Sequence, residues 1–373
     1  MIVGILKEPI GENRVSLLPE QAETLIKKGI TVLVENGAGN LSFASNESYL
    51  AKNVEIASRN EVLQKSDIVL SIQLLAETDI QLLQPNASLI GVFQPLYHFN
   101  TMQQWASKQY TTFSLDTLPR TTRAQSMDVL SSQANIAGYK AVLLAANTYT
   151  RYFPMFMTAA GSIPPVKLLI LGAGVAGLQA IATAKRLGAV VEVFDTRPAV
   201  KEEVMSLGAK FVEVEGAADA TKAGGYAVEQ SEEYKLKQQQ KIAEATAKAD
   251  IIITTAQIPG KPAPQLITEA MLNNMKAGSI IIDIAAATGG NTPFTKNNET
   301  VTYNGVTIIG NSNLPSTMPS DASKLYGKNV LNFMQLILSK EGTIALNFED
   351  DLVKGCCITY NGTIVNERVN SLL

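Results

Sequence analysis

Short apolar runs alternate with helical patterns along the first third of the chain. The predicted strands are residues 2–6, 31–35, 68–72, 88–93 and 110–115, and the predicted helices between them include residues 19–28 and 60–65. Strands that alternate with helices typically form a parallel sheet with helices on its faces. We therefore expect an α/β domain here, although these residues contain no glycine-rich dinucleotide fingerprint.

A long helical stretch over residues 127–148 leads to a second alternating pattern, which begins after Pro164 and Pro165. The predicted elements are strands 166–171, 190–194, 210–214, 250–254, 279–283 and 306–309, and helices 175–187 and 232–248. We expect the strand at 306–309 to close this second sheet. The chain then returns to a helix at residues 320–339, which we expect to pack on the first domain.

A chain of 373 residues exceeds the size at which one hydrophobic core usually keeps growing, so two domains are expected. We predict an α/β fold of two Rossmann-like parallel-sheet domains separated by a cleft, the first completed by the C-terminal segment. The first domain would comprise residues 1–135 and 311–373, and the second residues 136–310. The polar stretch after residue 214 is too long for an ordinary connection between a strand and a helix.

Composition narrows the possible partners and compartments. The net charge of -3 gives no field that would attract nucleic acid. The only cysteines, Cys356 and Cys357, are neighbours and cannot form a disulfide framework, so a reducing cytoplasm fits best and buried packing is their expected role. The start of the chain lacks signal-peptide features, and no apolar run approaches the roughly 18 residues that span a bilayer. Any membrane role must therefore come from a partner.

The sequence Gly172-Ala-Gly174-Val175-Ala176-Gly177 follows an apolar strand and opens an apolar helix. In that context the first glycine allows a tight turn, the second lets the backbone approach a pyrophosphate, and the third permits close packing of strand and helix. The helix N-terminus then faces the phosphates. A purely structural glycine turn is the alternative, but the context favours a dinucleotide site.

Asp195 ends the next predicted strand, 18 residues after Gly177, where a carboxylate can accept hydrogen bonds from the adenosine ribose hydroxyls. This favours NAD over NADP, because a 2'-phosphate would be repelled by that carboxylate. Arg197 could soften the repulsion, although we expect it to flank the adenine or to face solvent. Gln257 follows the strand at 250–254 and is a candidate contact for the nicotinamide ribose or carboxamide; an ordinary turn at Pro259 is the alternative.

Residues 120–135 are unusually dense in hydrogen-bonding side chains just before and inside a predicted helix start. Helix capping by Asp128 or Ser126 would explain only one or two of them. The group suggests a clamp around a planar polar group such as a carboxamide. Its members are Arg120, Gln125, Asp128 and Ser131.

Other candidate residues give weaker signals. His98 is the only histidine, and a lone histidine is more often structural than catalytic. Arg14 could bind a carboxylate substrate or simply pair with Glu12. His, Cys, Asp and Glu show no metal-ligand spacing, so no metal is expected.

Two runs resemble a known family. Residues 123–140, RAQSMDVLSSQANIAGYK, closely resemble the signature of the NAD(H)-binding component of proton-translocating nicotinamide nucleotide transhydrogenase, and residues 171–179, LGAGVAGLQ, resemble its fingerprint. The resemblance extends over essentially the whole chain and includes residues 4–8, 195–197 and 255–264. Alanine dehydrogenase is the nearest related family.

The resemblance implies Re/Si-specific, proton-translocating NAD(P)+ transhydrogenation, with NAD(H) on this chain and NADP(H) on a partner subunit. By position, the residues 120–131 named above would surround the nicotinamide, Asp195 the adenosine ribose, and Gln257 the nicotinamide ribose. Thr196 and Arg197, next to Asp195, are further candidates for cofactor binding. Tyr226 resembles the tyrosine of the family's mobile loop, here about residues 216–235, unless that stretch is a disordered linker. A homodimer, bound peripherally to the cytoplasmic face of the inner membrane through membrane-spanning and NADP(H)-binding subunits, is also implied.

Two departures separate the chain from alanine dehydrogenase. That family has a keto-acid-binding lysine after its third strand, where this chain has Ser71-Ile-Gln73. Its catalytic histidine aligns near Tyr97 without a gap, which leaves His98 one residue out of register. An amino-acid dehydrogenase and a non-catalytic NAD-sensing module remain the alternatives, and hydride transfer between nucleotides is preferred because it needs neither group.

Overall fold

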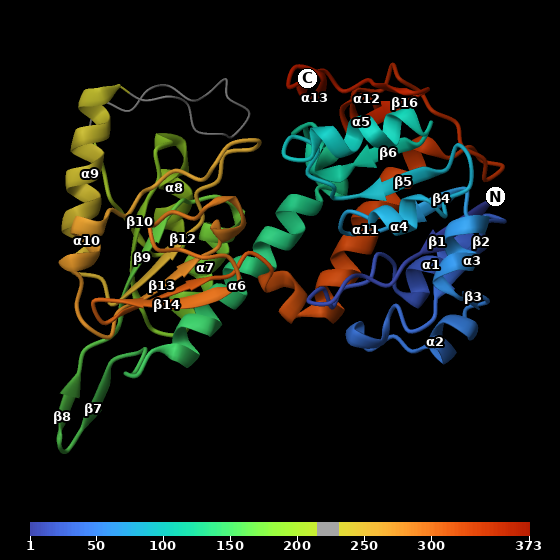
Figure 1. The fold of residues 1–373 in the computed structure, drawn as a ribbon. Helices are drawn as coiled ribbons and strands as arrows, with labels where there is room; N and C mark the ends of the chain where they lie inside the picture. The colour runs from blue at the N-terminus through green and yellow to red at the C-terminus, as the bar shows by residue number, and fades with distance from the viewer. Residues whose placement is uncertain (215–230) are drawn as a thin grey trace. The chain divides into compact units, whose positions relative to one another are not determined.

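The fold is described from a computed structural model, which describes residues 1–214 and 231–373. The chain forms two compact units (Figure 1). Unit 1 combines Met1–Gln133 with Ser316–Leu373, and unit 2 is Ala134–Pro315. Unit 1 is therefore built from two segments of the chain that are far apart in the sequence.

Unit 1 contains an eight-stranded sheet in the order β17-β16-β6-β5-β4-β1-β2-β3. The six strands from β6 to β3 are parallel, while β16 is antiparallel to β6 and β17 to β16. The strands are β1 (Ile2–Ile5), β2 (Thr31–Glu35), β3 (Glu55–Ala57), β4 (Ile68–Leu70), β5 (Ser88–Gly91), β6 (Thr111–Ser114), β16 (Cys357–Tyr360) and β17 (Thr363–Ile364). The C-terminal segment thus completes the first sheet, as predicted.

Helices cover both faces of this sheet because successive side chains of each strand point to opposite faces. Val32 and Val34 of β2 pack in one buried cluster, and Leu33 between them packs in the other. The first cluster receives α1 (Pro19–Ile26), α2 (Asn46–Leu50), α11 (Pro319–Ile337) and α12 (Asp351–Cys356). The second receives α3 (Arg59–Lys65), α4 (Glu77–Ile80), α5 (Phe99–Ser107) and α13 (Glu367–Asn370).

Unit 2 contains a seven-stranded sheet in the order β11-β10-β9-β12-β13-β15-β14. The strands are β9 (Lys167–Leu171), β10 (Val190–Phe194), β11 (Lys210–Phe211), β12 (Ile251–Thr254), β13 (Ile280–Asp283), β14 (Glu299–Tyr303) and β15 (Val306–Gly310). We expected the strand at 306–309 to close the sheet, and this was wrong. An antiparallel edge strand, β14, pairs with its outer side.

The helices of unit 2 also divide between two buried clusters. One face packs against α6 (Val129–Thr148), α7 (Val175–Arg186) and α8 (Lys201–Ser206), and the other against α9 (Glu232–Thr246) and α10 (Glu269–Asn273). A separate hairpin of β7 (Phe156–Thr158) and β8 (Gly161–Ile163) extends from this unit (Figure 1). Short 3-10 helices are η1 (Asn40–Ser42), η2 (Leu115–Thr117), η3 (Thr122–Met127), η4 (Pro198–Val200), η5 (Ala286–Thr288) and η6 (Leu314–Thr317). None of the helices in the described ranges is long and apolar enough to cross a membrane.

The parallel strands of both sheets follow one order. Counted within each unit, the order is 3-2-1-4-5-6, which is that of the dinucleotide-binding α/β fold. In such sheets, ligands bind at the carboxyl ends of the two strands where the order reverses. These switch points lie between β1 and β4 in unit 1 and between β9 and β12 in unit 2.

Candidate functional site

The glycine-rich loop lies at the switch point of unit 2, between β9 and α7. Gly172 has a φ of 108°, and a Cβ there would overlap the hydroxyl of Thr255. A Cβ on Gly177 would overlap the carbonyl oxygen of Gly172, whereas a Cβ on Gly174 would meet nothing within 4 Å. The loop is therefore tightly packed where strand and helix meet and open in front of Gly174. That is the space a pyrophosphate needs.

The first turn of α7 packs closely against α6 and has backbone N–H groups that can donate hydrogen bonds to a ligand. Helical geometry leaves the N–H groups of Val175, Ala176 and Gly177 without an intrahelical acceptor. Gly138 of α6 approaches so closely that a Cβ on it would overlap the carbonyl oxygen of Ala176. These donors, together with the helix dipole, fit an anionic group such as a phosphate.

Asp195 directly follows β10 and reaches back to the glycine-rich loop. One carboxylate oxygen, Oδ2, accepts a hydrogen bond from the backbone N–H of Ala173 at 2.7 Å. Arg197 donates to the same carboxylate from Nε and from Nη2, at 2.8 and 2.7 Å. This ion pair raises the pKa of Arg197. A carboxylate two residues away thus holds the Arg197 side chain, which is 19% exposed, and its expected place beside the adenine stays a prediction.

Gln257 lies just beyond β12, exposed at the carboxyl end of the sheet. Its side chain donates to the carbonyl oxygen of Ile284 at 3.2 Å. The loop that carries it is braced by Asn291, a fully buried residue whose Nδ2 donates to the carbonyl oxygens of Ala256 and Pro264 at 2.9 and 2.8 Å. Asn291 was not predicted, since nothing in the sequence near residue 291 marks it.

The switch point of unit 1 is filled by a buried carboxylate. Glu8, after β1, accepts hydrogen bonds from the backbone N–H groups of Ile72 and Gln73, at 2.6 and 3.1 Å. Burial raises the pKa of Glu8 to about 7, and the two backbone hydrogen bonds oppose that rise. A carboxylate of the protein itself thus occupies the place where a ligand would lie in such a sheet.

Arg14 lies beside this switch point, and its guanidinium is hydrogen-bonded to other side chains of the protein. Its Nε and Nη2 donate to the two oxygens of Glu12 at 2.8 and 2.6 Å, and its Nη1 donates to Gln133 at 2.8 Å. The side chain of Gln73 donates to Glu12 as well, at 3.3 Å. Of the two predicted roles for Arg14, pairing with Glu12 is the one observed. The side of the guanidinium that would bind a carboxylate through Nε and Nη2 is thus already bound to Glu12.

The polar segment at residues 120–131 of unit 1 has an apolar and a polar side. Ala124 and Met127 of η3 are buried in the core, while Arg120 and Gln125 are exposed. The segment thus presents its hydrogen-bonding side chains outward on a fixed backbone. Asp128 caps α6: its carboxylate accepts from the backbone N–H of Ser131 at 2.9 Å and from its hydroxyl at 2.6 Å.

Four other residues that the sequence analysis singled out are placed as follows. His98 is exposed immediately before α5. Cys356 and Cys357 are free thiols in the core of unit 1, as expected, and burial raises the pKa of Cys357 to about 12. Thr196 is half-buried beside Asp195. Tyr226 and the predicted loop residues 216–230 lie outside the described residues.

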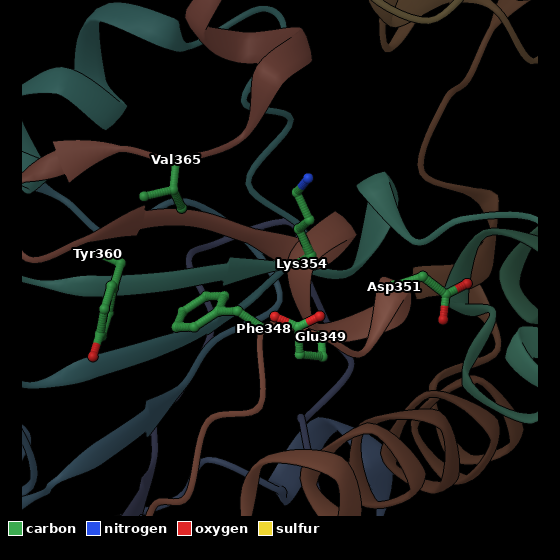
Figure 2. Close-up of a pocket in the computed structure, with 6 residues that line it drawn as sticks. All are labelled: Phe348, Glu349, Asp351, Lys354, Tyr360 and Val365. Atoms are coloured by element: carbon green, nitrogen blue, oxygen red, sulfur yellow. The ribbon is translucent and has the colours of Figure 1, made fainter.

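Unit 1 also has a surface hollow of about 480 Å³ near its C-terminal strands. Figure 2 shows the aromatic rings of Phe348 and Tyr360 on one side of it, with Lys354 and Asp351 on the other. Asp351 forms an ion pair with Arg123 of η3. The hollow contains none of the predicted site residues.

Two family models match the chain in succession: "Alanine dehydrogenase/PNT, N-terminal domain" over residues 4–137 and "Alanine dehydrogenase/PNT, C-terminal domain" over residues 141–367. The chain belongs to the alanine dehydrogenase/PNT family. Within this family the chain is 44% identical over 365 residues to the first part of NAD(P) transhydrogenase subunit alpha from Rhodospirillum rubrum, covering 95% of each chain. The corresponding protein from Rickettsia prowazekii is 45% identical, with 98% of this chain and 96% of the relative covered.

Solved structures and more distant relatives separate the two branches of the family. The crystal structure of transhydrogenase from Sinorhizobium meliloti is 42% identical, with a TM-score of 0.89, and the match covers 98% of this chain and 100% of that one. Alanine dehydrogenase of Staphylococcus epidermidis is only 26% identical over 378 residues, covering 99% of this chain and 96% of the relative. The chain thus belongs with the NAD(P) transhydrogenase alpha subunits of the alanine dehydrogenase/PNT family, as the sequence motifs predicted.

Proposed function

We propose that this chain is the NAD(H)-binding component of a proton-translocating NAD(P) transhydrogenase and exchanges hydride directly with NADP(H) bound on a partner subunit. The observation that carries the proposal is the glycine-rich loop at the switch point of unit 2, open in front of Gly174 and joined to Asp195. It occurs in a chain that is 44% identical to a transhydrogenase alpha subunit.

The residues of unit 2 bind and orient the nucleotide. The N–H groups at the start of α7 receive the pyrophosphate, and the carboxylate of Asp195 accepts from the adenosine ribose. Because Arg197 already donates twice to that carboxylate, its guanidinium moves aside or shares the acceptor when the ribose binds. Gln257, at the far side of the switch point, contacts the nicotinamide ribose.

The polar segment of unit 1 positions the nicotinamide end through Arg120, Gln125, Asp128 and Ser131. The dihydronicotinamide ring supplies the hydride, so the protein needs no general base. Arg14, a candidate for binding a carboxylate substrate, is already paired with Glu12. Holding the ring in one orientation and excluding water is then the main catalytic task of these side chains. By the family resemblance, Tyr226 is a further nucleotide contact.

We further propose that membrane-spanning and NADP(H)-binding subunits hold the chain at the cytoplasmic face of the inner membrane, and that the chain is a homodimer. The β7–β8 hairpin supports the second proposal. Phe156 and Met157 of β7 are 41% and 79% exposed, and Tyr152 and Met155 just before the strand are 55% and 60% exposed. Exposed apolar side chains grouped in this way are usual at protein interfaces. Sedimentation equilibrium of the wild-type chain and of a Phe156→Ser/Met157→Ser variant tests it: a dimer that becomes a monomer is expected, and a wild-type monomer would refute it.

The deciding experiment mixes the purified chain with an NADP(H)-binding transhydrogenase partner, supplies NADH and NADP⁺, and follows NADPH formation. A parallel reaction contains L-alanine and NAD⁺ without the partner. Partner-dependent NADPH formation with no alanine turnover is the expected result. Alanine turnover without the partner would replace the proposal with an amino-acid dehydrogenase, and NAD binding with no hydride transfer in either reaction would favour an NAD sensor.

A further inference from the structure

The polar segment at residues 120–131 is fixed by a helix that lies about two hundred residues further along the chain. Helix α11 runs along η3, whose Ala124 and Met127 are buried in the same core cluster as Val330 and Phe333 of α11. These apolar contacts keep the segment against the core. They do not fix its rotation or its exact position, because apolar packing is not directional. Directional contacts come from side-chain amides on α11.

Asn329 of α11 uses both ends of its side-chain amide. Its Nδ2 donates to the carbonyl oxygen of Ser126 in η3 at 2.8 Å, and its Oδ1 accepts from the hydroxyl of Ser132 in α6 at 2.7 Å. The side chain is buried, at 8% exposure. One residue thus spans the junction between η3 and α6, which contains Asp128. Asn332, one turn further along α11, donates to the same carbonyl oxygen at 2.9 Å.

Gln133, next to Ser132 in α6, is also hydrogen-bonded to α11. Gln133 donates to the carbonyl oxygen of Ala322 in α11 at 3.1 Å, so α6 is tied to this helix at a second position. By contrast, Gln125 and Arg120 on the outer side of the segment are exposed. The inner side is therefore fixed by specific hydrogen bonds, while the side chain of Gln125 on the outer side is exposed.

We propose that Asn329 is a positioning residue for transhydrogenation, which sets the carbonyl of Ser126 and thereby the orientation of Gln125 and Asp128 toward the nicotinamide. This inference rests on the proposed function. Asn329 touches no reacting atom; it acts through the segment. A small displacement of groups that orient a substrate lowers the rate strongly while binding elsewhere continues, so the effect appears in the rate of hydride transfer and not in nucleotide affinity.

Two variants test the donor and the acceptor of the Asn329 side-chain amide separately. Asn329→Asp keeps an oxygen that accepts from Ser132 but loses the donor to Ser126. Ser132→Ala keeps that donor and removes the Ser132 hydroxyl, with its contacts to Asn329, Val129 and Gln133. We expect Asn329→Asp to lower the rate of NADPH formation by about 10- to 100-fold at saturating NADH and pH 8. The dissociation constant for NADH should change less than threefold. Ser132→Ala, which keeps the hydrogen bond from Asn329 to Ser126, should lower the rate less than threefold.

A pH profile gives a second measurement that a merely structural role would not produce. In Asn329→Asp the new carboxyl can donate to the Ser126 carbonyl only when protonated, so some of the lost rate should recover as the pH falls from 8 to 6. Gln335→Glu introduces the same charge at an exposed position of α11 and serves as the matched control. It should follow the wild-type profile.

The outcomes distinguish the inference from the proposed function. If the wild-type chain forms no NADPH with its partner, the proposed function fails. If the wild type is active and Asn329→Asp is equally active, the inference alone fails. Equal losses from Asn329→Asp and Ser132→Ala, or a loss that is independent of pH and matched by a lower melting temperature, would also overturn it.

Discussion

Unit 2 and unit 1 use the same strand order but place different groups where that order reverses. In unit 2 the switch point holds glycines, N–H groups at a helix start and open space in front of Gly174. In unit 1 the carboxylate of Glu8 accepts the backbone N–H groups of Ile72 and Gln73. A strand order therefore creates a place for an acceptor of backbone N–H groups, and the side chains decide whether that acceptor is a ligand or belongs to the protein.

The largest effect is expected when the glycines at the switch point of unit 2, which is open in front of Gly174, are replaced. A Cβ on Gly177 would overlap the carbonyl oxygen of Gly172, so Gly177→Ala should destabilise unit 2 by about 1–3 kcal/mol and abolish measurable NADH binding. Gly174→Ala is the matched control for protein packing, because its Cβ meets only open space. It should leave the melting temperature unchanged and weaken NADH binding at least tenfold, roughly the effect of losing 1.4 kcal/mol.

Calorimetry and NADH fluorescence titration of both variants measure these effects. Unchanged NADH affinity in Gly174→Ala would mean that the open space in front of this residue is not the pyrophosphate site.

The closed switch point is tested through the titration of Glu8. Its pKa is raised from 4.5 to about 7 in the folded chain, so the folded state binds the proton more tightly than the unfolded state. This contribution to stability is complete below about pH 4.5 and is lost as the pH rises through 7. At about 1.4 kcal/mol per unit, the loss is on the order of 3 kcal/mol.

Glu8→Gln should therefore reduce the fall in stability between pH 5 and pH 8, as measured by urea unfolding at each pH. Glu55→Gln, at an exposed position of β3, is the control and should keep the wild-type dependence. A Glu8→Gln variant with the wild-type pH dependence would show that Glu8 does not titrate in this range.

A smaller effect is expected from the acidic residue of the open switch point. Asp195→Asn should weaken NADH binding about tenfold, because a hydrogen bond to a charged acceptor contributes about 1.5–3 kcal/mol. Arg197→Gln should instead lower the affinity for NADPH relative to NADH, since the carboxylate would lose its neutralising partner. Isothermal titration with both nucleotides compares the variants, and an Arg197→Gln variant that gains affinity for NADPH would contradict this role.

No effect is expected from restoring one amine to unit 1. Gln73→Lys places a lysine where alanine dehydrogenases are expected to have one, but Glu12 already occupies Arg14 and would attract the new ammonium too. Alanine-dependent NADH formation should stay undetectable. Its appearance would show that the unit 1 switch point is open to a keto acid after all.

The strands were the most predictable elements of the fold. The runs Thr31–Glu35 and Val190–Phe194 matched β2 and β10 because each is rich in valine and lies between turn residues. The run Glu299–Tyr303 was missed, since its alternating polar residues lie exposed at the edge of the sheet as β14. Local pattern thus identifies buried strands better than edge strands.

The candidate sites also differed in how much of each could be predicted from local sequence. The glycine-rich loop was predictable because its function depends on residues that are adjacent in the sequence. The partners of the segment at 120–131 were not, because Asn329 lies 203 residues from Ser126 and no local pattern links them. The ion pair of Arg197 is local, but a side-chain rotamer and not a residue pattern decides whether it forms.

The two-segment construction of unit 1 has a consequence for the order in which the protein is made. During synthesis, residues 134–315 leave the ribosome before residues 316–373, so unit 2 can fold while unit 1 still lacks α11, β16 and β17. Until then the outer edge of β6 is unpaired, and an unpaired strand edge can associate with other chains. Unit 2 is thus expected to be complete first, and unit 1, which carries the polar segment, becomes native only after the C-terminal segment has emerged.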